Sequence, residues 1–170
     1  MTASQRRQEI LSRLKSEHSP VSATALAQSF GVSRQVVVGD IALLRAGGAP
    51  IAATPRGYLL DMPTDGILHT VAVRHTDAQM ERELQICVDN GCTVVDVLVE
   101  HPVYGQLVGQ LQLSNRYDVE QFLHRVRSGG VHPLSTLTDG IHLHTLRCPS
   151  EEAYQRVCDQ LEQEGFLLKD

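Results

Sequence analysis

Two short helical segments joined by a glycine constrain the first part of the chain most strongly. Ser22 precedes the small and apolar residues of 23–30, and Ser33 precedes a second helical pattern over 34–45. Serine is a preferred N-cap residue because its hydroxyl accepts a hydrogen bond from a backbone N–H of the first helical turn. Gly31 supplies the tight turn between the two segments. This arrangement predicts a helix-turn-helix unit.

A further helix and a hairpin flank this unit. Thr2 or Ser4 caps a helix that is predicted to reach about Glu17, and a hairpin is predicted over 51–60 with its turn at 55–57. The hairpin follows the second helix of the unit directly, which is the place of a wing. We therefore predict a winged helix-turn-helix domain over residues 1–62.

The first residues of the second helix in such a unit reach base edges in the major groove. In this chain they are Ser33, Arg34 and Gln35. Arg reads guanine bidentately, Gln reads adenine, and Ser binds either base or a phosphate. Arg56 at the predicted wing tip is placed for a phosphate or minor-groove contact. We therefore assign DNA binding to these four residues.

The charge distribution supports a nucleic-acid partner for the first domain. Residues 1–60 hold seven Lys or Arg against three Asp or Glu, whereas the rest of the chain holds eight against seventeen. A basic segment is attracted to a polyanion such as double-stranded operator DNA. Arg6 and Arg7 are expected to add phosphate contacts. The alternative is a protein–protein adaptor, because winged helices also serve in that role.

The remainder of the chain, after a linker predicted at 62–66, alternates strand and helix patterns. The order β-α-β-β-α-β-α predicts an α+β sandwich over residues 63–170, with helices on one face of an antiparallel or mixed sheet. Residues 165–168 are expected to add an edge strand. Strands are expected at 67–74, 92–100, 104–113 and 141–147, and helices at 77–90, 117–129 and 150–164.

Two histidines in the last predicted strand form the most unusual pattern of this second domain. His142 and His144 are two residues apart, so both side chains point to the same face of the strand. Neutral imidazole is the commonest side-chain ligand of transition metals. The pair is therefore a candidate half of a metal site. The alternative is a solvated strand face that carries two histidines.

The other half of a metal site is expected one strand and one helix away. His75 ends the first predicted strand of this domain, and Glu83 lies in the helix that follows, with Glu81 as a competing carboxylate. A strand end and one face of the next helix converge on the histidine strand if the two strands are close. Three imidazoles and a carboxylate suit a divalent transition metal such as Zn²⁺, Ni²⁺, Mn²⁺ or Fe²⁺.

The segment Glu100-His101-Pro102-Val103-Tyr104-Gly105 lies between two predicted strands. One interpretation is a hairpin loop that proline makes rigid. The other is a ligand-binding lip, in which His101 and Tyr104 grip a small planar anion near the metal. The residues alone leave both interpretations open.

Composition narrows the remaining alternatives. No apolar run approaches the roughly 20 residues of a membrane helix, and the four cysteines form no CxxC pair. These features indicate buried thiols in a reducing cytoplasm and no membrane partner. The sequence shows no nucleophile elbow, phosphate loop or paired-carboxylate motif, and it therefore disfavours an enzyme.

Three stretches together resemble the nicotinate-responsive transcriptional repressors known as the NiaR family. The resemblance covers essentially the whole chain, and two of the stretches are long and unusual. The stretches are VSRQV at 32–36 with DI at 40–41, EHPVYG at 100–105, and LTDGIHLHT at 137–145.

This resemblance implies a winged helix-turn-helix followed by a 3H, or three-histidine, domain with an HPr-like α+β fold. It implies a homodimer and a metal bound by His75, Glu83, His142 and His144, and it matches His101 to a further family histidine. It also implies nicotinate as the corepressor, and control of genes for NAD biosynthesis or niacin uptake.

In such a repressor the carboxylate of nicotinic acid is expected to bind an open position of the metal and nearby cations, for which Arg74 and Arg116 are candidates. The pyridine ring is expected to lie against apolar or aromatic surface near Tyr104. Two alternatives remain. One is a metal-dependent enzyme fused to a DNA-binding domain, with His101 or Glu100 as the base. The other is a structural metal in a purely dimerising domain.

Overall fold

The computed structural model describes residues 1–61 and 65–169 of the chain. The chain divides into two compact units, Met1–Thr64 and Asp65–Asp170. The linker predicted at 62–66 falls mostly on residues 62–64, which lie outside the described residues. Within the described ranges, no helix is both long enough and apolar enough to cross a membrane.

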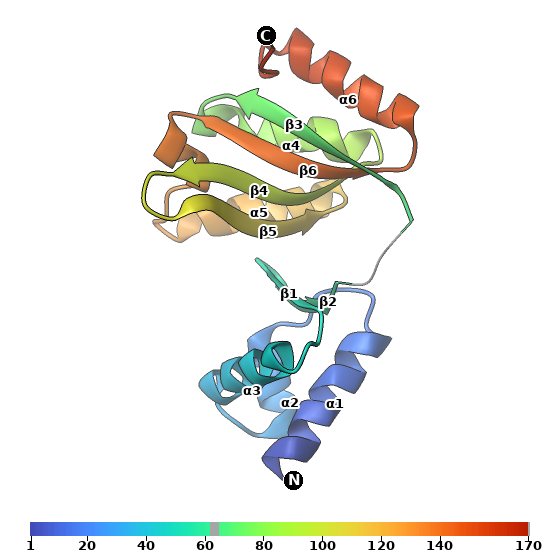
Figure 1. Ribbon diagram of the computed structural model, residues 1–170, viewed down its shortest axis with the longest axis vertical. Helices are drawn as coiled ribbons and strands as arrows, with labels where there is room; N and C mark the ends of the chain where they lie inside the picture. The colour runs from blue at the N-terminus through green and yellow to red at the C-terminus, as the bar shows by residue number, and fades with distance from the viewer. Residues whose placement is uncertain (62–64, 170) are drawn as a thin grey trace. The chain divides into compact units, whose positions relative to one another are not determined.

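Three helices and a two-stranded hairpin make up the first unit (Figure 1). Thr2, Ser22 and Ser33 cap the helices, and each side chain accepts a hydrogen bond from the backbone N–H three residues on. Gly31 follows the second helix in the left-handed conformation, with a φ of 63°, which glycine adopts without steric cost. The elements are α1 (Ala3–Ser16), α2 (Ala23–Phe30), α3 (Arg34–Ala46), β1 (Ile51–Thr54) and β2 (Gly57–Leu60).

An aliphatic core holds the first unit together. Val37 and Ile41 of α3 are almost fully buried in it, so the opposite side of α3 faces outward. Strands β1 and β2 pair antiparallel with Thr54 opposite Gly57, which leaves a two-residue turn at the end of the predicted wing. The other core residues include Ile10, Leu14 and Leu26.

The second unit is an antiparallel sheet with its helices packed against one face (Figure 1). Its strands are β3 (Ile67–Arg74), β4 (Thr93–His101), β5 (Gly105–Leu113) and β6 (Ile141–Cys148). Its helices are α4 (Met80–Asp89), α5 (Arg116–Ser128) and α6 (Glu151–Gln163), with 3-10 turns at Asp77–Gln79 (η1) and Leu134–Thr138 (η2). The strand order is β3-β6-β4-β5, so the last strand lies between the first two.

The α+β fold and the order of elements agree with the sequence prediction. The helix predicted at 77–90 begins as the η1 turn and continues as α4, whereas η2 was not predicted. The tail makes a single bridge between Leu167 and Val73, and Leu168 N donates to Ala72 O at 2.9 Å. The expected edge strand is therefore reduced to a short contact along β3.

Strand β6 shows clear alternation. His142, His144, Leu146 and Cys148 are buried toward the helices, while the residues between them are more exposed. Its pairing with β4 is interrupted between Val94 and Leu98. The histidine pair therefore points into the layer between sheet and helices and not toward solvent.

Candidate metal centre and DNA-binding surface

Four polar side chains meet on the helix-covered face of the sheet. His142 and His144 come from β6, His75 follows β3 directly, and Glu83 lies on α4. Val73 pairs with His142 in the β3–β6 ladder, which brings the end of β3 beside the start of the histidine strand. All four side chains belong to residues that are between 1% and 7% exposed. The structure therefore brings together the four residues predicted as metal ligands.

The three imidazole Nε2 atoms converge on the Glu83 carboxylate. His75 Nε2 lies 2.5 Å from Oε2, and the Nε2 atoms of His142 and His144 lie 3.4 and 3.1 Å from Oε1. Ligand atoms of His75, Glu83 and His142 all lie within 4.8 Å of one another. Metal–ligand bonds of about 2.0–2.2 Å place two ligands of one ion roughly 3–4 Å apart, a spacing close to that of these atoms, so the three residues form a candidate ligand group.

Each imidazole is held by a hydrogen bond on its other nitrogen. The Nδ1 atoms of His75, His142 and His144 donate to backbone carbonyl oxygens at 2.8, 2.9 and 2.6 Å. A carbonyl only accepts, so Nδ1 carries a proton, and each ring in its neutral form presents its lone pair at Nε2. Metal-binding histidines are commonly oriented in this way. The three acceptors belong to Thr76, Gly140 and Asp96.

The electrostatics of the cluster favour an ionised Glu83. Burial by itself raises the pKa of this carboxyl, but the facing imidazoles outweigh burial and hold the pKa well below its ordinary value. Burial lowers the pKa of His144 and of His75, yet Glu83 raises both above their ordinary value. Among the described residues, Oε1 of Glu83 makes no hydrogen bond of ordinary geometry although it is buried. A divalent cation satisfies such a carboxylate oxygen beside three imidazole nitrogens.

Two residues that support the cluster were not among the predicted site residues. Gly140 has a φ of 85°, and a Cβ there would overlap the carbonyl oxygen of His75. Only glycine therefore lets this turn pass the end of β3. Asp96 orients His144 through its carbonyl, and its side chain accepts a hydrogen bond from Thr145 N at 3.0 Å. The sequence signals are the Asp-Gly turn and a lone carboxylate inside an apolar strand.

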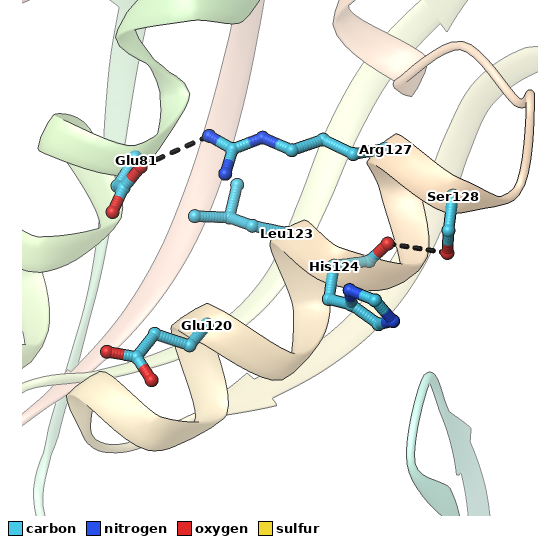
Figure 2. A pocket seen from close by; sticks show the side chains of 6 residues that line it. All are labelled: Glu81, Glu120, Leu123, His124, Arg127 and Ser128. Atoms are coloured by element: carbon cyan, nitrogen blue, oxygen red, sulfur yellow. Dashed lines mark hydrogen bonds and ion pairs between the residues drawn. The ribbon is translucent and has the colours of Figure 1, made fainter.

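The competing carboxylate, Glu81, does not join the cluster. It pairs with Arg127 of α5 at 3.1 Å. Figure 2 shows this pair, with Glu81 on α4 and Arg127 on α5. The two residues help to line an open groove of about 400 Å³. No residue predicted to bind the metal or the effector lines this groove. The other lining residues are Glu120, Leu123, His124 and Ser128.

Three of the four residues predicted for effector binding lie at the same end of the sheet as the metal cluster. His101 and Tyr104 belong to the β4–β5 hairpin, and Arg74 ends β3 beside the start of β6. Arg116 begins α5, after the opposite end of β5, and donates two hydrogen bonds to Asp89. The structure therefore does not bring Arg116 to the cluster.

The hairpin at 101–105 gives His101 a local role. Its Nδ1 accepts hydrogen bonds from the backbone N–H groups of Val103 and Tyr104 at 3.1 and 3.2 Å, which closes the turn. Tyr104 is 74% exposed. Arg74 pairs with Asp139 at 2.7 Å. These contacts fit the interpretation as a rigid hairpin loop, and a ligand-binding role for the same residues stays a prediction.

The start of α3 presents the residues predicted to bind DNA. The Ser33 hydroxyl caps the helix by accepting from Val36 N at 3.3 Å, and Arg34 and Gln35 are exposed. Arg56 lies in the turn of the hairpin, but its side chain is partly buried and does not form a fully exposed tip. The start of α3 therefore presents more exposed polar surface than the hairpin turn does at Arg56.

Arg6 and Arg7 have a structural role that the sequence did not indicate. Their guanidinium groups lie 2.6 and 3.5 Å from the carboxylate of Asp40. Asp40 is 4% exposed and is the one acidic residue of α3. These two arginines pair with a buried carboxylate and tie α1 to α3, and their expected phosphate contacts stay a prediction.

Known protein families match both units of the chain. The family described as an HTH domain matches residues 6–59, and the 3H domain matches residues 68–170. A probable transcription repressor NiaR of Thermotoga maritima is 42% identical over 166 residues, which cover 98% of this chain and 95% of that protein. The transcription repressor NadR of Bacillus subtilis is 44% identical over 170 residues, which cover 97% and 94%.

A more distant similarity is confined to part of the chain. An uncharacterised protein of Methanothermus fervidus is 25% identical over 108 residues, or 60% of this chain and 17% of that protein. The two relatives matched over nearly their full length are named as transcription repressors and not as enzymes, so the metal-dependent enzyme is not retained as an alternative. The chain belongs to the family of 3H-domain transcription repressors that includes NiaR and NadR.

Proposed function

We propose that this chain is a transcriptional repressor that binds operator DNA and responds to nicotinate through a metal-binding 3H unit. The observation that carries the proposal is the convergence of three Nε2 atoms on the buried Glu83 carboxylate. Residues 1–62 form the DNA-binding domain and residues 63–170 the regulatory domain. The regulated genes are those of NAD biosynthesis or niacin uptake, and the protein acts in the cytoplasm.

The proposed metal ligands are His75, Glu83, His142 and His144. A bound divalent ion supplies a Lewis-acidic centre that attracts a carboxylate. The donor set of three imidazoles and one carboxylate accepts Zn²⁺, Ni²⁺, Mn²⁺ or Fe²⁺. The metal content of the purified protein, measured by mass spectrometry, identifies which ion is retained.

The proposed DNA contacts are Ser33, Arg34 and Gln35 to bases and Arg56 to the backbone. A homodimer presents two recognition helices to half-sites about 34 Å apart, one turn of the duplex. Nicotinate changes DNA affinity only if it binds the DNA-competent dimer more tightly than the other state. As a corepressor, it raises the affinity for operator DNA.

The proposed effector contacts are those at the cluster end of the sheet. His101 and Tyr104 belong to the hairpin at that end, and Arg74 ends the neighbouring edge of the sheet. Arg74 is exposed, and its carboxylate partner Asp139 is 90% exposed at the side chain. Exchange of such a surface partner for the nicotinate carboxylate costs little.

Calorimetric titration tests the regulatory part of the proposal. The metal-loaded protein is expected to bind nicotinate and to discriminate against nicotinamide, which lacks the carboxylate. Glu83→Gln is expected to lose metal and nicotinate binding together. Glu81→Gln, two residues earlier on the same part of the chain and paired at the surface, is the matched control and is expected to keep both.

A DNA-shift assay with and without nicotinate then measures the sign of regulation. If neither pyridine binds at full metal occupancy, the effector assignment is wrong. The metal then serves a structural role in a dimerising domain, and its removal by a chelator is expected to unfold the 3H unit. Sedimentation of the metal-loaded and metal-free protein reports the dimer directly.

A further inference from the structure

Gly39 lies at the centre of the outward side of α3. Helical residues advance by about 100° each, so Gln35 and Val36 precede Gly39 by one turn on that side and Leu43 follows it by one turn. Val36 and Leu43 are 39% and 58% exposed. The outward side of α3 therefore has large apolar side chains on both sides of a position that has no side chain.

The fold of the first unit does not require a glycine at this position. A Cβ built on Gly39 meets no atom within 4 Å other than those of its chain neighbours and of the surrounding helix backbone, and the residue does not have a positive φ. Gly39 lies within α3, well away from both ends. Glycine weakens an exposed helix interior relative to alanine because it gives up more backbone freedom on folding. The chain thus keeps a destabilising residue where its own packing would accept a larger one.

The surface around Gly39 also lacks negative charge from α3. Asp40 is buried, and Arg6 and Arg7 neutralise it. Between Arg34 and Arg45, the exposed residues of the helix are all uncharged. Such a surface does not repel phosphates, and its apolar groups are suited to contact the 5-methyl group of thymine in the major groove.

We propose that Gly39 is a specificity-determining residue of the DNA interface. The missing side chain lets the backbone of α3 lie close to the base edges, so that Val36 contacts the methyl group of a thymine. The inference rests on the proposed function, since it applies only if α3 enters the major groove. It names a contact to T·A base pairs, in addition to the contacts of the polar residues at the start of the helix.

The full-length protein first selects a DNA duplex from a pool of random sequences, and this selected duplex is the probe in the binding assays. Gly39→Ala is expected to lower the affinity for the selected duplex by about tenfold, and Gly39→Leu to lower it further. Both variants are expected to melt at a higher temperature than the wild type, because alanine and leucine favour helix. A merely structural role for Gly39 predicts instead that stability and affinity fall together.

Deoxyuridine substitution tests the thymine contact itself. Replacing one thymine of the selected duplex removes a single methyl group. At the contacted position the wild-type affinity is expected to fall about fourfold, which corresponds to ~0.8 kcal/mol for one buried carbon. Gly39→Leu is expected to be insensitive to the same replacement, because its α3 no longer approaches the base.

Ser12→Ala on the exposed side of α1 is the matched control. It favours helix in the same unit and is expected to leave DNA affinity unchanged. If Gly39→Ala binds the selected duplex as tightly as the wild-type protein does, the inference is wrong, but the proposed repressor function is not affected. If the wild-type protein enriches no sequence at all, the proposed DNA-binding function fails and the inference fails with it.

Discussion

The metal cluster predicts opposite pH dependences for the metal-free and the metal-loaded protein. Burial lowers the pKa of His75 and His144, but Glu83 raises both above the ordinary value of 6.5. A group whose folded pKa is raised stabilises the fold fully below its unfolded pKa and loses that contribution as pH rises through the folded pKa. The metal-free protein is therefore expected to lose stability as pH rises above about 6.5.

Glu83 sets the lower end of the pH range in which the metal-free protein is most stable. Burial raises the pKa of this carboxyl, but the imidazoles hold it well below 4.5, so its contribution is present above 4.5 and is lost as pH falls through the folded value. The metal-free protein is thus most stable between roughly pH 4.5 and 6.5. Each extra proton held by the native state contributes about 1.4 kcal/mol per pH unit. Two imidazoles therefore give a loss of at most about 2.8 kcal/mol per pH unit above this range.

Bound metal reverses the dependence because only deprotonated imidazoles bind an ion. Rising pH removes the competing protons, strengthens metal binding and raises the stability of the loaded protein by mass action. Urea unfolding followed by circular dichroism, from about pH 5.5 to about pH 8, with chelator or with added metal, measures both slopes. Glu83→Gln is expected to reduce the slope of stability against pH in both the metal-free and the metal-loaded protein, whereas Glu81→Gln is expected to leave both slopes unchanged. Metal-free stability that stays level or rises over this range would refute the reasoning.

Three further predictions test other parts of the structure. Asp40→Ala, which leaves the Arg6 guanidinium without its partner at 2.6 Å, is expected to destabilise the first unit by about 2 kcal/mol, and an unchanged urea midpoint would contradict it. Gly140→Ala is expected to lower the free energy of unfolding by at least about 2 kcal/mol, because the φ of 85° disfavours a side chain and a Cβ would overlap His75 O. A variant with the melting temperature and metal affinity of the wild type would argue against this prediction. Iodoacetamide is expected to alkylate the half-buried Cys158 first in the native protein. Burial raises the pKa of the other thiols, those of Cys87, Cys92 and Cys148. Peptide mass spectrometry measures the order of labelling, and earlier labelling of Cys92 would contradict this prediction.

Local patterns were enough to predict much of the fold. Serine caps mark the starts of α2 and α3, and the strand expected at 67–74 begins and ends at those residues. The alternation of β6 places both histidines on one face because side chains in a strand alternate. The apolar phase of α4 favours Glu83 over Glu81, since Glu83 lies among the buried residues of that helix. These features depend on residues a few positions apart.

Contacts between distant residues were beyond the reach of such patterns. The position of β6 between β3 and β4 brings His75 beside His142, and a list of predicted strands does not contain that order. Asp40 pairs with Arg6 across 34 positions of sequence, a contact that the local pattern did not indicate. Arg116 was a reasonable cation by type, but the direction of β5 places it at the other end of the sheet. The sequence shows which chemistry each side chain can perform, whereas the partner of that side chain depends on the tertiary fold.

The number of donors in the cluster links the identity of the metal to the action of nicotinate. The proposed ligands His75, Glu83, His142 and His144 would supply four donors, and each residue is at most 7% exposed. Zn²⁺ in a closed site is satisfied by four tetrahedral ligands and has no position left for a carboxylate, whereas Mn²⁺ prefers octahedral coordination. Nicotinate is therefore expected to bind the manganese-loaded protein more tightly than the zinc-loaded protein in titrations at matched occupancy. Equal affinities would mean that side chains such as Arg74, and not the ion, hold the carboxylate.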